Sequence, residues 1–153
     1  RDIFASFGIN ESTQFFKELK AQGQFFKLFK GDAMGHYPRG AVFSCDELEA
    51  ELKAFGEHKK TAVGPLFGKK MLGAFGVAGA IENIIISPFS DILGLMNGSR
   101  RPAIIWADNL SCKYDEQNAH FSLSFELIKG AYATNFLREV LGRDDIFNFF
   151  EKD

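Results

Sequence analysis

The residues best suited to hold a ligand lie where the sequence predicts that a strand gives way to a helix, at Lys129, Gly130, Ala131 and Tyr132. Free backbone N–H groups at the start of a helix attract anions, phosphate included. A tyrosine at that point can present its ring to a ligand. The alternative is an ordinary connection whose tyrosine packs on the sheet, and these residues by themselves leave both interpretations open.

Basic side chains occur in pairs next to turns. Lys69 and Lys70 end a glycine-containing loop, and Arg100 and Arg101 follow the turn Asn97-Gly98-Ser99. Arginine can bind a phosphate group through two parallel hydrogen bonds. The lysine loop is not a P-loop, because the spacing Gly-x-x-x-x-Gly-Lys-Ser/Thr is absent. Each pair is therefore a candidate phosphate contact, with a solvated surface as the alternative.

Other catalytic arrangements are missing from the sequence. No pair of carboxylates has a spacing that marks an acid and a base, and no Gly-x-Ser-x-Gly motif occurs. The two cysteines, Cys45 and Cys112, lie far apart, which indicates reduced thiols in a cytosolic protein. The three histidines are equally scattered. We therefore expect no metal site.

Composition indicates an ordinary globular protein. Of the 153 residues, 46% are hydrophobic and 25% are charged, and 18 of the hydrophobic residues are Phe. The chain has 18 Lys+Arg and 20 Asp+Glu, which gives a net charge of −2. This balance excludes a mostly disordered chain, a collagen-like repeat and a disulfide scaffold. It also argues against a wholly basic nucleic-acid binder, so any such surface must be local. The longest apolar stretch, around Ile84–Ile86, is too short to cross a membrane.

The first hundred residues are predicted to form short helices separated by turns. Apolar residues at helical spacing, such as Phe15, Phe16 and Leu19, indicate an amphipathic helix, and Ser44 with Glu47 forms a capping box that would open another. The predicted elements are helices at 11–22, 44–55, 71–83 and 91–96, a strand at 41–43 and a basic loop at 56–70.

The last third shows a clearer pattern. A strand is predicted at 103–107, followed by a polar turn at 115–118. From His120 to Ile128 polar and apolar residues alternate, which predicts a strand with one buried face. A helix follows at 131–141 and ends at Gly142. The fold class is α+β, with a mixed or antiparallel sheet and packed helices.

Residues 123–139 read Leu-Ser-Phe-Glu-Leu-Ile-Lys-Gly-Ala-Tyr-Ala-Thr-Asn-Phe-Leu-Arg-Glu. This segment resembles the C-terminal signature of the TruD family of tRNA pseudouridine synthases: a strand ending Leu-Pro-x-Gly, then Ser-Tyr/Phe-Ala-Thr, then a helix with Leu-Arg-Glu. Ile128 and Ala131 depart from the usual Pro and Ser. Upstream, 29–40 and 61–68 are similar to the Gly-Asp segment and the Gly-Pro loop of the domain inserted in these enzymes.

The resemblance implies both an organisation and a reaction. Residues 1–105 would be most of the inserted TRUD domain, and 106–153 the closing strand and helix of the catalytic domain. The reaction would isomerise uridine at position 13 of tRNA to pseudouridine in the cytoplasm, through an aspartate and without cofactor or metal. The expected partners are tRNA and the remainder of the enzyme, with no membrane.

The resemblance also implies roles for single residues. Tyr132 matches the family's aromatic position and would stack on the substrate base, beside Gly130 in the substrate site. Arg138 would pair with the catalytic aspartate, or else form a structural ion pair with Glu139 or another helix. RNA phosphate contacts are expected from lysines and arginines that include Lys59, Lys60, Lys69, Lys70, Arg100 and Arg101.

Two family motifs, Gly-x-Lys-Asp with the catalytic aspartate and Asn-Tyr-Phe-Gly-x-Gln-Arg-Phe-Gly, do not occur in residues 1–153. We therefore expect the C-terminal part of such an enzyme, inactive by itself because the aspartate belongs to a missing N-terminal part. The alternative is a non-catalytic RNA-binding or interaction module. A weaker third interpretation is a small-anion-binding domain that uses the helix start at Gly130–Tyr132.

Overall fold

The computed structural model describes residue 8 and residues 13–142. Its backbone divides into two compact units, Arg1–Ile104 and Ile105–Asp153. The α+β class predicted from the sequence is confirmed, and all strand pairs in the described residues are antiparallel.

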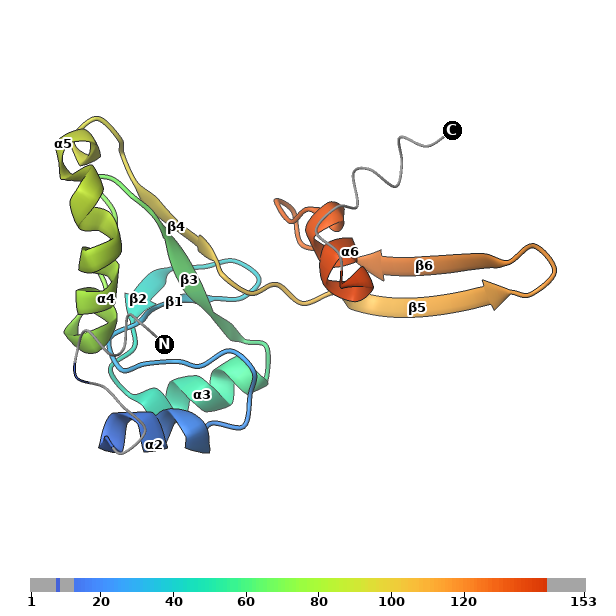
Figure 1. Cartoon of the computed structure of the whole chain (residues 1–153), viewed down its shortest axis with the longest axis horizontal. Helices are drawn as coiled ribbons and strands as arrows, with labels where there is room; N and C mark the ends of the chain where they lie inside the picture. Colours follow the sequence, from blue (N-terminus) through green and yellow to red (C-terminus); the bar gives the residue numbers. More distant parts are fainter. Residues whose placement is uncertain (1–7, 9–12, 143–153) are drawn as a thin grey trace. The chain divides into compact units, whose positions relative to one another are not determined.

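Unit 1 is built on a four-stranded sheet with the order β2-β1-β3-β4. The strands are β1 (Ala33–His36), β2 (Val42–Ser44), β3 (Lys60–Leu66) and β4 (Ser99–Pro102) (Figure 1). Strand β3 is central: it pairs with β1 through its first residues and with β4 through its last.

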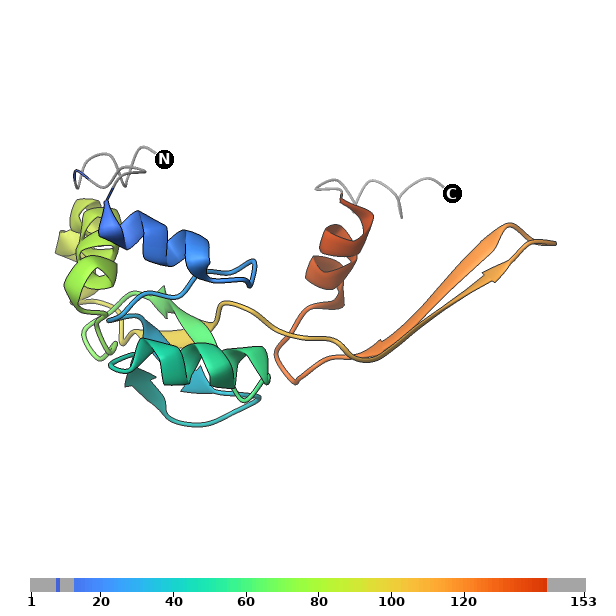
Figure 2. The same ribbon diagram turned by 90° about the horizontal axis from the view of Figure 1, so that it is seen from below.

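The helices of unit 1 are α2 (Gln14–Ala21), α3 (Leu48–Gly56), α4 (Gly76–Ile86), the 3-10 turn η1 (Ser87–Phe89) and α5 (Ser90–Leu93). Helix α3 lies across the strands (Figure 2), and α4, η1 and α5 follow one another as a column. The buried apolar residues of the described chain all belong to unit 1: Leu19, Leu28, Ala33, Met34, Cys45, Phe55, Ala62, Val63 and Ala78.

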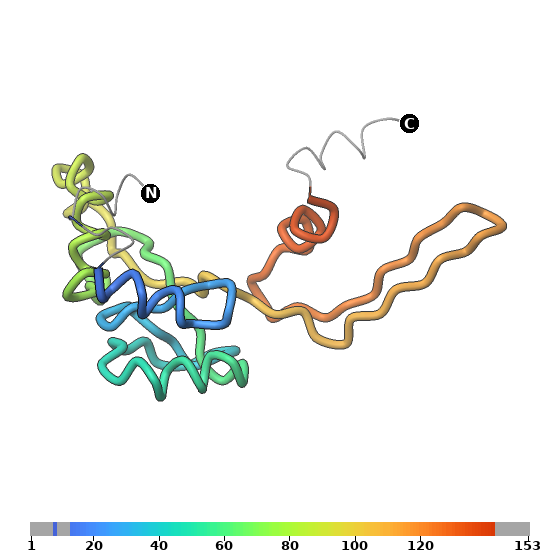
Figure 3. Tube along the Cα trace, turned by 60° about the horizontal axis from the view of Figure 1, so that its bottom comes forward, coloured from blue at the N-terminus to red at the C-terminus, as the bar shows by residue number. Residues whose placement is uncertain are grey.

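Unit 2 consists of a hairpin and a helix. Strand β5 (Asp108–Asp115) pairs with β6 (His120–Glu126), and α6 (Ala133–Leu141) follows (Figure 3). Gly142, in the left-handed conformation with φ 59°, ends α6 as predicted. The rings of Phe125 and Phe136 lie 4.4 Å apart and join strand to helix.

Strand β3 corrects the predicted loop at 56–70. The pair Gly64-Pro65 suggested a loop, because proline lacks the N–H that a central strand donates. In the structure β1 pairs only with residues 60–62, and β4 takes over from Val63 onward. Pro65 therefore has a paired neighbour on one side only, as on an edge strand, where it is tolerated.

Two other predicted elements are wrong. Ser44 ends β2 and caps no helix; α3 begins at Leu48 after Glu47, which makes no side-chain cap. The predicted strand at 103–107 is instead the end of the sheet: β4 stops at Pro102. Beyond it the Ala103 N–H donates to the Ala62 carbonyl at 2.8 Å, and the Ile104 carbonyl accepts from the Thr61 hydroxyl at 3.0 Å.

The sequence predicted one of the two strands of the hairpin. Residues 120–126 do form a strand, but its apolar face is not buried: Phe121 is 55% exposed. Strand β5 was missed, although Leu110, Cys112 and Tyr114 alternate with polar residues and would have indicated it. Helix boundaries also differ from the prediction: α4 begins at Gly76, whereas the helix was predicted at 71–83. The predicted helix at 11–22 is described only from residue 13 onward.

Candidate functional site

The connection from β6 to α6 is a tight, ordered turn. The Ala131 N–H donates to the Ile128 carbonyl at 3.0 Å, and Gly130 between them has φ 97°. A Cβ on Gly130 would meet no atom within 4 Å, so the backbone conformation alone requires glycine there. The turn thereby fixes the residue that follows it.

Tyr132 is the N-cap residue of α6, with an extended backbone and no side-chain cap. Its carbonyl accepts from the N–H groups of Asn135 and Phe136, at 3.0 and 3.3 Å, which ties the residue to the helix. Its side chain is free of the core, because Tyr132 is 63% exposed. Within unit 2 the ring therefore does not pack on the sheet. This differs from the alternative given above, an ordinary connection whose tyrosine packs on the sheet.

Arg138 lies in the last turn of α6 and is half-buried. It lies six positions after Tyr132, which is about 9 Å along the helix axis and roughly 120° around it. Arg138 also makes a contact within the protein. The two side chains therefore start from different sides of α6, and a role for one does not require the other.

Arg100 does not have the surface position expected of a phosphate contact. Its guanidinium forms an ion pair with Glu82 of α4 and also donates to the carbonyls of Leu72 and Val63. The Arg100 side chain is 2% exposed. This correction makes Arg100 a structural link between β4 and α4, whereas its neighbour Arg101 is exposed.

Lys69 and Lys70 are exposed and close to that strand. Their N–H groups donate to the carbonyls of Met96 and Asn97, at 3.1 and 2.7 Å, so the two loops run together. The loops meet at glycines: a Cβ on Gly68 would lie 2.3 Å from the Gly98 nitrogen. This contact brings the lysine pair to the start of β4, the strand that also carries Arg101.

The other two lysines expected to contact phosphate, Lys59 and Lys60, form ion pairs within the protein. Lys59 forms an ion pair with Glu57 at 2.7 Å, and Lys60 with Glu51 at 2.8 Å. The Lys60 ammonium also lies 4.7 Å from the centre of the Phe43 ring. Both lysines thus have partners already.

Asp32 is a half-buried residue of unit 1 that the sequence did not single out. Burial raises the pKa of its carboxyl from 3.8 to about 6, against the lowering effect of the Phe29 N–H, which donates to Oδ2 at 2.7 Å. Glu82 raises that pKa further, and Arg100 lowers it. The backbone carbonyl of Asp32 accepts from the N–H of Cys45. Burial raises the pKa of the Cys45 thiol to about 11.

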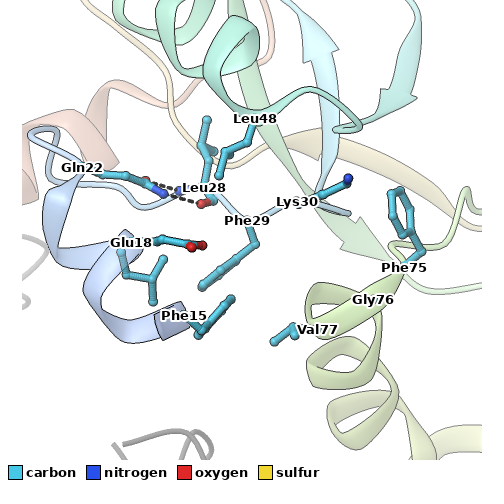
Figure 4. Close-up of a pocket in the computed structure, with 11 residues that line it drawn as sticks. Phe15, Glu18, Gln22, Leu28, Phe29, Lys30, Leu48, Phe75, Gly76 and Val77 are labelled. Atoms are coloured by element: carbon cyan, nitrogen blue, oxygen red, sulfur yellow. Dashed lines mark hydrogen bonds between the residues drawn. The ribbon is translucent and has the colours of Figure 1, made fainter. Parts of the chain in front are cut away.

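A cavity of about 260 Å³ opens between α2, the segment before β1 and the start of α4 (Figure 4). Phe15 and Phe29, stacked 5.4 Å apart, line it together with Phe75 and Val77. The lining is apolar apart from Glu18, Gln22 and Lys30, which do not make an acid–base pair. The described residues hold no cluster of three metal-ligating side chains.

One described helical stretch, Gly76–Leu93, is long and apolar enough to cross a membrane by length and composition, which the sequence did not predict. It is interrupted by the 3-10 turn at Ser87–Phe89.

Residues 19–140 match the family model for tRNA pseudouridine synthase D (TruD). The chain belongs to the TruD family.

Curated relatives agree with this assignment. The chain is 43% identical over 136 residues to tRNA pseudouridine synthase D of Campylobacter jejuni, a match that covers 88% of this chain and 36% of that protein. It is 40% identical over 128 residues to the Helicobacter hepaticus protein of the same name, covering 84% and 32%. The chain therefore spans about a third of the length of the TruD relatives it matches.

A solved structure of a TruD protein from Methanosarcina mazei shares the fold. Its TM-score is 0.56 at 21% identity, over 76% of this chain and 32% of that one. The TruD resemblance seen in the sequence is thus confirmed. The segment that carried it, residues 123–139, comprises the end of β6, the turn with Gly130, and most of α6 with Tyr132.

Proposed function

We propose that this chain supplies the base-stacking and RNA-contacting part of a cytoplasmic tRNA pseudouridine synthase. The reaction isomerises uridine at position 13 of tRNA: the N1–C1′ bond breaks, a C5–C1′ bond forms, and a proton leaves C5 while N1 gains one. The TruD aspartate motif is absent from residues 1–153. The contribution of this chain is therefore to bind and orient the substrate.

One observation carries the proposal, the exposed ring of Tyr132 at the start of α6. An enzyme that acts on a base must first take it out of the stack, and the extruded base needs an aromatic face to lie against. Tyr132 offers such a face from a backbone held by a glycine turn and by the first hydrogen bonds of α6. Gly130 belongs to the same substrate site.

The other assignments follow from the resemblance to the TruD family. Residues 1–105 would form most of the inserted TRUD domain and 106–153 the closing part of the catalytic domain. Lys69, Lys70 and Arg101 are exposed and would contact phosphates, which positions the RNA without reading its sequence. Arg138 would face the catalytic aspartate and favour its ionised form.

The test uses the natural full-length protein and a tRNA transcript that carries uridine at position 13. We expect pseudouridine at that position, measured by mass spectrometry of the digested RNA, at the same rate with and without EDTA. A transcript with cytidine at position 13 is the control. Tight tRNA binding without any conversion would contradict the proposal and favour the non-catalytic RNA-binding module.

A further inference from the structure

The segment between α2 and β1 presents an isolated aromatic ring to solvent. Phe25 is 99% exposed, more than any other large hydrophobic residue that the structure describes. Its neighbour Phe26 points the other way, with its ring 6.4 Å from that of Phe55 in α3. The two consecutive phenylalanines therefore have opposite environments, one packed on the domain and the other in water.

Hydrogen bonds between its own residues hold the loop that carries Phe25 in place. The buried Gln22 amide donates to the Leu28 carbonyl at 2.7 Å and accepts from the Leu28 N–H at 2.9 Å. The Gln24 amide donates to the Gln22 side chain, and the Lys27 ammonium donates to the carbonyls of Gln22 and Gln24. Five hydrogen bonds thus hold residues 22–28, so a partner of Phe25 would not have to order this loop on binding.

The sequence on both sides of Phe25 is basic. Between residues 17 and 30 the chain has four lysines, Lys17, Lys20, Lys27 and Lys30, and a single acidic residue, Glu18. The Lys27 ammonium is bonded to the loop carbonyls and that of Lys20 lies 5.0 Å from the centre of the Phe16 ring, but both keep their positive charge. This local excess of positive charge occurs in a chain whose net charge is −2. It complements a polyanion such as a nucleic-acid backbone.

The pattern distinguishes between two kinds of partner. Hot-spot residues of a protein interface cluster together, but Phe25 is the one exposed large hydrophobic residue in the described part of the chain before Val42. A single ring in a basic segment is the arrangement that binds single-stranded nucleic acid, where bases stack on aromatic faces and lysines neutralise phosphates. We infer that Phe25 stacks on an unpaired base of the RNA substrate, as an aromatic contact in addition to that of Tyr132; the identity of that RNA as tRNA rests on the proposed function.

Direct binding tests this inference in the natural full-length protein with a fluorescein-labelled tRNA transcript. Phe25→Ala should weaken the affinity by roughly 5- to 150-fold, which is the effect of losing one base–aromatic stack. Phe25→Tyr should bind like the wild type, because it keeps the ring. Leu95→Ala removes another exposed apolar side chain of unit 1, 84% exposed, and should leave the affinity unchanged. All three variants should unfold at the wild-type temperature.

The outcomes separate this inference from the proposed function. If the wild type converts uridine at position 13 but Phe25→Ala binds tRNA as tightly, the inference is overturned and the proposed function stands. If Phe25→Ala weakens binding and the wild type makes no pseudouridine, the inference stands and the proposed function fails. Unchanged RNA affinity together with a loss of self-association in Phe25→Ala would assign the ring to a protein partner and overturn the inference.

Discussion

Tyr132 is the residue on which the proposed activity depends most directly. We expect Tyr132→Ala to lower kcat/KM on tRNA by about 10- to 100-fold, because one stacking contact to the extruded uridine is lost. Tyr132→Phe keeps the ring and should retain most of the activity. Neither change should alter stability, since the side chain is exposed in unit 2. Equal turnover by Tyr132→Ala and the wild type would remove this residue from the site.

Gly130 should affect activity through the backbone. Its φ of 97° is strained for any residue with a Cβ, so Gly130→Ala should cost on the order of 1 kcal/mol and shift the turn that positions Tyr132. Gly142 at the other end of α6 has φ 59° and also has open space around it, so Gly142→Ala is a matched control with a similar backbone cost. We expect turnover to fall in Gly130→Ala only; a similar fall in both variants would indicate a general loss of stability.

Asp32 should make unit 1 sensitive to pH. Its pKa is about 6 in the folded protein against 3.8 for the free group, so the folded state favours the protonated carboxyl. The stability this gives is complete below pH 4 and is lost as the pH rises through 6. The unfolding free energy should therefore fall over that window, by on the order of 2 kcal/mol.

The measurement is urea unfolding of the wild type and Asp32→Asn between pH 4 and 7. The Asn variant keeps an oxygen that can accept the Phe29 N–H, and it should show a much flatter profile. The exposed Asp115 is the control: hydrogen bonds from Asn118 hold its pKa below the usual 3.8, so Asp115→Asn should keep the wild-type slope in this range. Parallel profiles for Asp32→Asn and the wild type would contradict this assignment.

At the scale of secondary-structure elements, the pair Arg100 and Arg101 separates structure from RNA binding. Removing one member of a buried ion pair leaves the other charge without compensation, so Arg100→Met should destabilise the protein by about 3–5 kcal/mol. Arg101→Gln should leave stability nearly unchanged, lower tRNA affinity and reduce the salt dependence of binding by about one phosphate contact. The double variant Arg100→Met with Glu82→Met should regain part of the lost stability, measured by urea unfolding.

The sequence predicted those elements whose signals are local. Helix α6 has apolar residues at helical spacing and a C-terminal glycine, and both of its boundaries lie within two residues of the prediction. Strand β3 could not be predicted in this way, because what tolerates Pro65 is the change of pairing partner from β1 to β4, which depends on distant segments. The interpretation of Arg100 as a phosphate contact was wrong for the same reason: its partner Glu82 is 18 residues away, on another element. The exposure of Phe25 also depends on tertiary contacts, since the adjacent Phe26 has the same side chain.

For the molecule as a whole, the two units differ in how they are stabilised. Unit 1 contains every buried apolar residue that the structure describes, including the fully buried Leu28 and Met34. No described residue of unit 2 is buried, and Tyr114 and Phe121, paired across the hairpin, are 62% and 55% exposed. A two-stranded hairpin is marginally stable at best in water, and its outer edges offer unpaired backbone groups to other strands.

We therefore expect residues 1–104 and 105–153, produced separately, to behave differently. The first segment should be monomeric and unfold cooperatively on heating. The second should aggregate, or remain soluble only in complex with the rest of a TruD catalytic domain, because its exposed strand edges and apolar side chains need a partner. Light scattering and thermal unfolding followed by circular dichroism measure both properties. A soluble monomer of residues 105–153 with a cooperative transition would show that the hairpin and α6 are stable without further strands, and unit 2 would then be a domain in its own right.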